Sequence, residues 1–140
     1  MHTETIPVIT ELDAARIREL GARNRAPREA HAALRDLVAK VTERSEIVPG
    51  RRVAPDVVTV NSTVSFRDEA SESVHRVSVV FPQDASIAER RISVLSPVGC
   101  ALLGRSVGDI AWFVLPDGTA RAIRLLELHY QPEASGDYTR

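Results

Sequence analysis

The chain has 140 residues but only one cysteine, and aromatic side chains make up only 4% of it. A single cysteine excludes an internal disulfide bond and a zinc site built from several thiolates, and it fits a reducing compartment. No apolar run approaches the roughly 18 residues that a membrane-spanning helix needs. The start, MHTETIPVITELD, lacks the basic residues and apolar core of a signal peptide. We therefore expect a cytoplasmic protein that does not interact with membranes.

An excess of charge of one sign is also missing, because 18 basic residues are balanced by 19 acidic ones and the formal net charge is −1. Proteins that bind nucleic acid usually present a basic face. We therefore expect no direct, sequence-specific binding of nucleic acid. The hydrophobic content of 44% is ordinary for a globular protein. The length suits one domain, or a small domain with an appendage.

The hydrophobic pattern divides the chain near residue 48. Before this point, apolar residues recur at helical spacing, first over residues 9–20 and then over 34–41. Thr10 and Asp13 resemble a helix-capping pair, Gly21 is an expected helix end, and Pro27 suits the first turn of a second helix. We predict that residues 1–48 form an antiparallel helical hairpin, or short coiled coil.

After the stretch VPGRRVAP (48–55), the hydrophobic period changes from the helical value to two. Alternation in VVTVNSTVSFRD and VHRVSVVF predicts paired strands, RISVL predicts another, and PDG predicts a turn between two closing strands. We expect residues 49–140 to form an antiparallel sheet of about five strands with one short helix, so that the chain is α+β. The polar tail after Tyr130 is expected to be extended.

Residues 99–106, GCALLGRS, differ by one residue from the phosphate-binding loop G-x-x-x-x-G-K-[ST], because Arg105 replaces the lysine. A phosphate-binding loop precedes a long helix, whose free N–H groups face the phosphates. Here Ser96 can cap a short helix, Pro97 can begin it, and Gly104 can end it. We therefore interpret GCALLGRS as a short buried helix with its terminator, and not as a nucleotide site.

The longer stretch ISVLSPVGCALLGRSVGD (92–109) resembles the C-terminal domain of Gre-type transcription elongation factors. That family has a strand, a Ser-Pro turn, a short apolar helix and a Val-Gly-Asp turn in this order. DVVTVNSTVSFRD (56–68) and LELHYQPEASGDY (126–138) resemble the Rnk family, regulators of nucleoside diphosphate kinase. Together these resemblances cover nearly the whole chain. They imply an FKBP-like fold that docks on RNA polymerase at the rim of its secondary channel.

The resemblance also implies a docking surface. Leu95, Ser96 and Pro97 match the turn that contacts the polymerase rim, although Leu95 stands where cleavage factors often have an acidic residue. The turn residues expected to shape this surface are Gly104, Gly108 and Asp109. The alternative is purely structural: the Ser-Pro pair starts the helix, and the glycines and the aspartate form the turn.

Cleavage-stimulating Gre factors carry acidic residues at the tip of a long coiled-coil finger, where they help to hold a catalytic Mg²⁺ in the polymerase. This chemistry needs oxygen ligands, whereas the predicted tip here contains Arg23, Asn24 and Arg25. The second helix has at most about 20 residues, or about 30 Å. We therefore expect a regulator that docks without stimulating RNA cleavage and competes with Gre factors. Alternatively, the hairpin dimerises or packs on its own domain.

Other functions find less support in the residues. His2, His31, His75 and His129 lack metal-ligand spacing, so we expect no metal and no cofactor. Cys100 is expected to be a small buried residue. A second hypothesis is control of nucleoside diphosphate kinase through another protein contact. A third, an FKBP-like prolyl isomerase, is disfavoured by the scarcity of aromatic residues. We thus expect a monomer or weak dimer that is not an enzyme.

Overall fold

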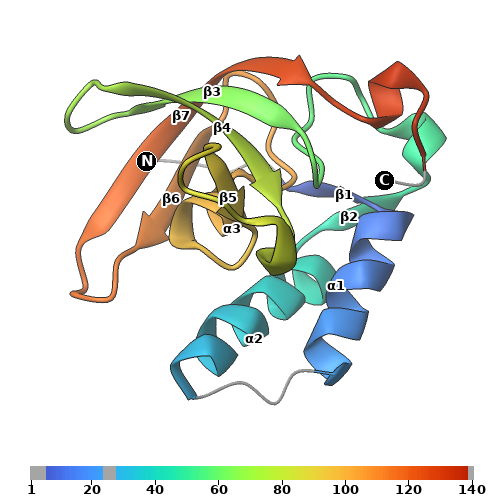
Figure 1. Cartoon of the computed structure of the whole chain (residues 1–140), viewed down its shortest axis with the longest axis horizontal. Helices are drawn as coiled ribbons and strands as arrows, with labels where there is room; N and C mark the ends of the chain where they lie inside the picture. The colour runs from blue at the N-terminus through green and yellow to red at the C-terminus, as the bar shows by residue number, and fades with distance from the viewer. Residues whose placement is uncertain (1–5, 24–27, 139–140) are drawn as a thin grey trace.

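The computed structural model describes residues 6–23 and 28–138 and confirms the α+β class. A helical hairpin lies on one side of a curled five-stranded sheet, and a small two-stranded sheet lies between them (Figure 1). The hairpin consists of α1 (Glu11–Arg23) and α2 (Arg28–Glu43). It is flanked by β1 (Val8–Thr10) and β2 (Glu46–Val48), which pair in parallel.

The predicted helical hairpin is present, but two of its boundaries differ from the prediction. Residues 8–10 form a strand instead of the first helical turn, because Ile9 pairs with Ile47 and its side chain is buried in the core. Gly21 does not end α1, which continues to Arg23. A Cβ atom on Gly21 would lie 3.0 Å from Cγ2 of Val38, so this glycine allows α1 and α2 to approach each other closely. Pro27 lies outside the described residues.

The five-stranded sheet has the order β5-β4-β3-β7-β6. Its strands are β3 (Thr63–Asp68), β4 (Val74–Val80), β5 (Arg91–Ser93), β6 (Ile110–Val114) and β7 (Ala120–Tyr130). The predicted antiparallel hairpins β3–β4 and β6–β7 are confirmed. The sheet is mixed rather than wholly antiparallel, since β5 pairs with β4 in parallel. The connection through the short helix η2 (Pro82–Asp84) lets the chain re-enter the sheet in the same direction.

The segment before β3 is not a strand, although its hydrophobic pattern predicted one from residue 57. It turns sharply at residues 59–62, where Asn61 has a φ of 74° and the N–H of Ser62 donates to the carbonyl of Thr59. Val58 and Val60 are nevertheless fully buried. The apolar residues here cover the core without joining the sheet, so alternation alone gave a wrong strand boundary.

One hydrophobic core joins residues from both sides of residue 48. It includes Ile17 and Leu37 from the hairpin, together with Val79, Leu102 and Ile123 from the rest of the chain. The hairpin therefore packs on the sheet. This packing is one of the alternatives inferred from the sequence. No helix within the described ranges has the length and apolar character needed to cross a membrane.

The tail after Tyr130 is not extended as predicted. Gln131 and Glu133 are buried, and Glu133–Ser135 form a short 3-10 helix, η3. The side-chain amide of Gln131 donates to the carbonyls of Ala54 and Val57 at 2.8 and 2.7 Å. The hydroxyl of Thr59 donates to the Glu133 carboxylate at 2.7 Å. These polar side chains are buried because their hydrogen bonds connect the tail to the segment before β3.

Candidate functional site

The Ser-Pro turn predicted to dock begins the short helix α3 (Pro97–Leu102). The hydroxyl of Ser96 accepts the N–H of Gly99 at 3.1 Å and donates to the carbonyl of Ser93 at 2.6 Å. Pro97 occupies the first helical position, where a backbone N–H is not needed. The predicted helix start is confirmed, and Pro97 is exposed at the surface.

The two glycines of GCALLGRS allow close backbone contacts. A Cβ atom on Gly99 would lie 2.1 Å from the carbonyl oxygen of Ser93. Gly104 has a φ of +85°, and a Cβ atom there would lie 2.8 Å from Cβ of Pro7. The carbonyl of Gly104 accepts the N–H of Val8 at 3.0 Å, which attaches β1 to the end of α3. Glycine is therefore required at both positions for packing.

The backbone donors of this segment are already used within the protein. The N–H of Leu103 donates to the backbone carbonyl of Gly99. The N–H of Gly104 donates to the carbonyl of Val58, and the N–H of Arg105 donates to that of Leu102. Leu102 and Leu103 are fully buried. A phosphate-binding loop needs such N–H groups to point at its ligand. The geometry therefore supports the interpretation of GCALLGRS as a helix with its terminator.

Gly108 and Asp109 form the turn into β6. The carboxylate of Asp109 accepts the N–H of Ser106 at 2.9 Å, and Gly108 has a φ of +95°. The N–H of Gly108 donates to the carbonyl of Leu125, and the N–H of Leu125 donates to that of Asp109. This turn holds the segment after α3 against β7. Its residues have a clear structural role, as the alternative interpretation proposed.

Leu95, Ser96 and Pro97 line a groove of about 870 Å³ between α2, α3 and β6. Gly104, Gly108 and Asp109 do not line it, so the structure separates the turn residues from the predicted docking residues. The groove also contains Trp112 and Val114 on the edge strand β6, with 50% and 64% of their surface exposed. Sequence reasoning missed these two as site residues. The signal was available, because apolar side chains that alternate outward on an edge strand are exposed.

Lys40 connects the hairpin to the floor of this groove. Its side chain is buried, and its ammonium group donates to the carbonyl of Cys100 at 2.5 Å and to that of Ala101 at 3.5 Å. A cation near the last carbonyls of a helix is favourable. Cys100 is only half-buried, less than predicted, although it packs against the core and burial raises the pKa of its thiol. Nothing in the residue pattern indicates the contact between Lys40 and α3.

A second buried polar contact joins α1 to the segment before β3. The Asp13 carboxylate is fully buried and accepts the N–H of Val60 at 2.9 Å. The backbone N–H of Asp13 donates to the hydroxyl of Thr10 at 3.1 Å, so the predicted capping role of Thr10 is confirmed. Desolvation raises the pKa of Asp13 from 3.8 to about 7, and the nearby Glu133 carboxylate adds to this effect.

The predicted hairpin tip cannot be placed, because Asn24 and Arg25 lie outside the described residues and only the backbone of Arg23 is described. Among the residues that the structure does describe, no three His, Cys, Asp or Glu side chains cluster as metal ligands would. The groove presents an exposed proline, an exposed tryptophan and nearby charged side chains, a combination typical of a contact surface.

Comparisons with known proteins agree on the family to which this chain is related. Residues 53–130 match the family described as "Transcription elongation factor, GreA/GreB, C-term". The chain is 38% identical over 131 residues to proteins named "Regulator of nucleoside diphosphate kinase" from Escherichia coli (strain K12) and Shigella flexneri, covering 94% of each sequence. It also resembles the solved structure of "Prokaryotic transcription elongation factor GreA/GreB from Nitrosomonas europaea". That match has a TM-score of 0.69 and 35% identity, and it covers 91% of this chain and all of the other.

Proposed function

Because the chain belongs to the family of GreA/GreB C-terminal domains and is homologous to regulators of nucleoside diphosphate kinase, we propose that it regulates transcription by binding RNA polymerase. Its fold is the FKBP-like fold of that family. Gre-type factors dock at the rim of the secondary channel of the polymerase, and the proposed docking site here is the groove that contains Ser96 and Pro97.

The observation that carries this proposal is the presentation of the Ser-Pro turn. The hydrogen bonds of Ser96 are made within the turn, so its backbone is held rigidly while Pro97 remains exposed. Trp112 lines the same groove and is half exposed. Rigid apolar and aromatic groups contribute most of the affinity in many protein interfaces, because little conformational entropy is lost on binding.

The hairpin supports docking without cleavage. The helices α1 and α2 have 13 and 16 residues, so the longer of them extends about 24 Å. The sequence of the tip contains arginines and no carboxylate, whereas holding Mg²⁺ requires oxygen ligands. A protein of this kind occupies the docking site without supplying the acidic tip. It would therefore compete with Gre factors that do supply it.

The test is a pull-down of core RNA polymerase with Pro97→Asp. Aspartate is favourable in the first turn of a helix, so the variant should fold, which circular dichroism checks. Pro82→Asp is a matched control, since Pro82 also begins a short helix but does not line the groove. We expect Pro97→Asp to lose binding and Pro82→Asp to keep it. Undiminished binding by folded Pro97→Asp would refute the assignment of this surface.

A second candidate function follows from the name of the homologues, which describes them as regulators of nucleoside diphosphate kinase. The protein could act on that kinase through direct contact. Purified kinase activity, measured with and without the protein and in the absence of polymerase, separates the two functions. The transcription proposal predicts no change in this assay, and a saturable change would favour the second candidate.

A further inference from the structure

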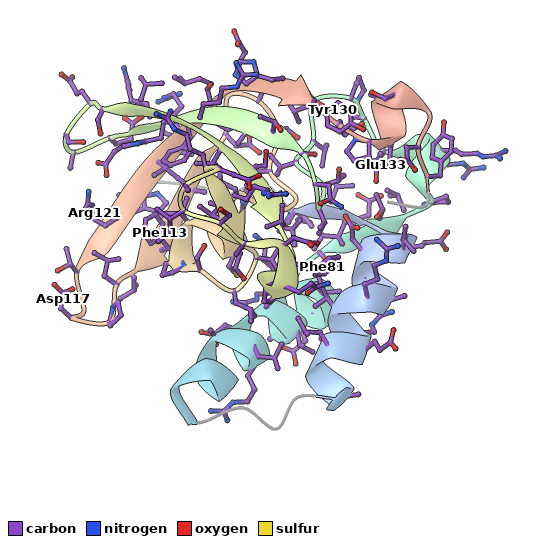
Figure 2. All side chains as sticks on the ribbon, viewed as in Figure 1. Phe81, Phe113, Asp117, Arg121, Tyr130 and Glu133 are labelled. Carbon is purple, nitrogen blue, oxygen red and sulfur yellow. The ribbon has the colours of Figure 1, made fainter. Side chains whose placement is uncertain are left out.

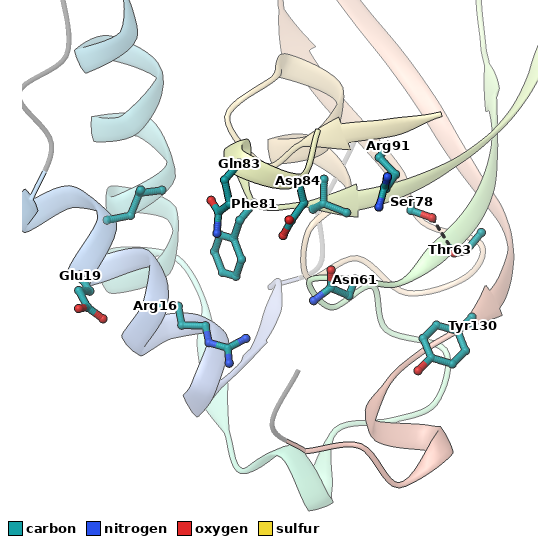
Figure 3. Close-up of a pocket in the computed structure, with 12 residues that line it drawn as sticks. Arg16, Glu19, Asn61, Thr63, Ser78, Phe81, Gln83, Asp84, Arg91 and Tyr130 are labelled. Carbon is teal, nitrogen blue, oxygen red and sulfur yellow. Dashed lines mark hydrogen bonds between the residues drawn. The ribbon is translucent and has the colours of Figure 1, made fainter. Parts of the chain in front are cut away.

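A second cavity lies on a different face from the docking groove and shares none of its residues. It has a volume of about 960 Å³ and is bounded by α1, by η2 and by the sheet (Figure 3). Figure 2 shows Tyr130 at one end of β7 and Asp117 and Arg121 near the other, so the cavity lies far from the tip of the β6–β7 hairpin. This volume is within the range of small-molecule sites.

Polar side chains from five parts of the chain converge on this cavity. They are Arg16 of α1, Asn61 of the turn before β3, Asp84 of η2, Arg91 of β5 and Tyr130 of β7 (Figure 3). Residues far apart in the sequence thus contribute to one polar surface. Convergence of this kind is typical of a ligand site and is not required for packing.

Asn61 occupies an unusual backbone position. Its φ of 74° lies in the left-handed region, which glycine adopts without strain, and its N–H donates to the carbonyl of Val79 at 2.6 Å. Asparagine is one of the non-glycine residues that tolerate this region, and Figure 3 shows its amide side chain extending into the cavity. Residues held in sparsely populated backbone regions cluster at functional sites.

The arginines indicate the chemistry of the ligand. Figure 3 shows the guanidinium of Arg16 and the side chain of Arg91 on different sides of the cavity. Arg91 pairs with Glu89, and its buried Nε atom has no hydrogen-bond partner within the described part of the chain. Guanidinium groups bind the oxygens of phosphates and carboxylates in a fork geometry.

The remaining groups add donors and acceptors around this anion site. The amide of Asn61 and the phenol of Tyr130 can donate to oxygens of a ligand in the cavity. The carboxylate of Asp84 also lines the cavity, and it accepts N–H or O–H groups. A bare inorganic anion would offer no donor to this carboxylate. A small molecule that has both an oxyanion and hydrogen-bond donors would match the cationic groups and the Asp84 carboxylate.

We propose that this cavity binds a small metabolite that carries a phosphate or carboxylate group together with hydroxyl or amino groups. Arg16 and Arg91 attract the oxyanion of the ligand from two sides of the cavity, Asn61 and Tyr130 offer hydrogen bonds to the ligand, and Asp84 accepts from the donors of the ligand. Because Arg16 belongs to the helical hairpin and the other residues to the sheet side, the bound metabolite would bridge the two. The proposal is independent of polymerase binding.

The probes are ribose 5-phosphate, citrate and inorganic pyrophosphate, titrated at constant ionic strength into the full-length, isotope-labelled protein. We expect saturable NMR shifts at the backbone amides of residues 61, 84 and 91 with either ribose 5-phosphate or citrate. The probe that binds more tightly shows whether the site takes a phosphate or a carboxylate. Pyrophosphate lacks amino and alcohol groups and is expected to bind at least tenfold more weakly. The absence of saturable shifts around the cavity with all three probes would overturn the proposal.

The variants separate binding from folding. Arg16→Gln should lower the affinity at least tenfold, and Arg18→Gln, on the exposed side of the same helix, should leave it unchanged. Asn61→Gly relieves the backbone strain, so it should preserve the fold and still weaken binding several-fold. An equal loss in Arg18→Gln would show that the anions bind by general charge, and unchanged affinity in Asn61→Gly and Arg16→Gln would likewise refute the assignment.

Discussion

Replacing Asp13 with asparagine should remove a large pH-dependent contribution to folding stability. The pKa of this buried carboxyl is raised from 3.8 to about 7, mainly by desolvation and further by the Glu133 carboxylate. Hydrogen bonds from Val60 and Thr10 oppose the rise. Between these two pH values, the folded protein retains a proton that the unfolded chain has released. The contribution of Asp13 to stability is therefore greatest below pH 3.8 and is lost as the pH rises to about 7.

The size of this effect follows from the two pKa values. A rise from 3.8 to about 7 corresponds to about 4 kcal/mol of folding free energy. Asparagine can still accept the N–H of Val60, but its N–H₂ group replaces Oδ1, an atom with no hydrogen-bond partner in the described structure. That unpaired donor costs about 1–3 kcal/mol at every pH. The difference between variant and wild type should therefore change by about 4 kcal/mol in favour of Asp13→Asn between pH 4 and pH 8.

Urea denaturation at a series of pH values from 4 to 8 measures this difference directly. Asp36→Asn is the matched control, because Asp36 is exposed on α2 and the same chemical change there leaves no buried group altered. We expect the control to follow the wild-type pH profile within about 0.5 kcal/mol. Parallel profiles for wild type and Asp13→Asn would refute the reasoning, since they would show that Asp13 is ionised at the same pH in the folded and unfolded states.

Three other changes test the remaining geometry. Gly104→Ala should destabilise the fold by about 1–3 kcal/mol in urea, because its backbone has a φ of +85° and the new Cβ would meet Pro7; Gly118→Ala, with a φ of +88° and open space around it, isolates the backbone cost. ATP and GTP should not bind residues 99–106, and calorimetry that showed micromolar affinity abolished by Arg105→Ala would contradict this. Asp and Glu at positions 23 and 24 should not create RNA cleavage in stalled elongation complexes, since the helices remain short; transcript shortening would contradict it.

The local features of the docking turn could be predicted from the sequence. Ser96 as a cap, Pro97 at the first helical position and Gly104 after the helix each depend on neighbours within a few residues. The two antiparallel hairpins were also predicted, because alternation and turn residues are local signals. These elements supply the family resemblance and the proposed docking surface.

The failures share one cause, which is dependence on a distant partner. Residues 8–10 form a strand because β2 lies beside them, and Gly21 lies inside α1 at a point where the helix approaches Val38 of α2 closely. Asp13 was interpreted as part of a cap, but its carboxylate reaches Val60 across 47 positions. Glu133 was assigned to an extended tail, yet it is buried against Thr59. Periodicity and capping rules carry no information about such contacts, which arise only when the hairpin and the tail pack on the sheet.

Competition for RNA polymerase tests the central claim most directly. Purified protein is added in increasing excess to a backtracked elongation complex that contains the cognate polymerase and a cleavage-stimulating Gre factor, and transcript shortening is followed over time. We expect no shortening with the protein alone, and a saturable slowing of Gre-stimulated cleavage that Pro97→Asp no longer causes. Robust cleavage by the protein itself, or undiminished Gre activity at saturating excess, would contradict the account.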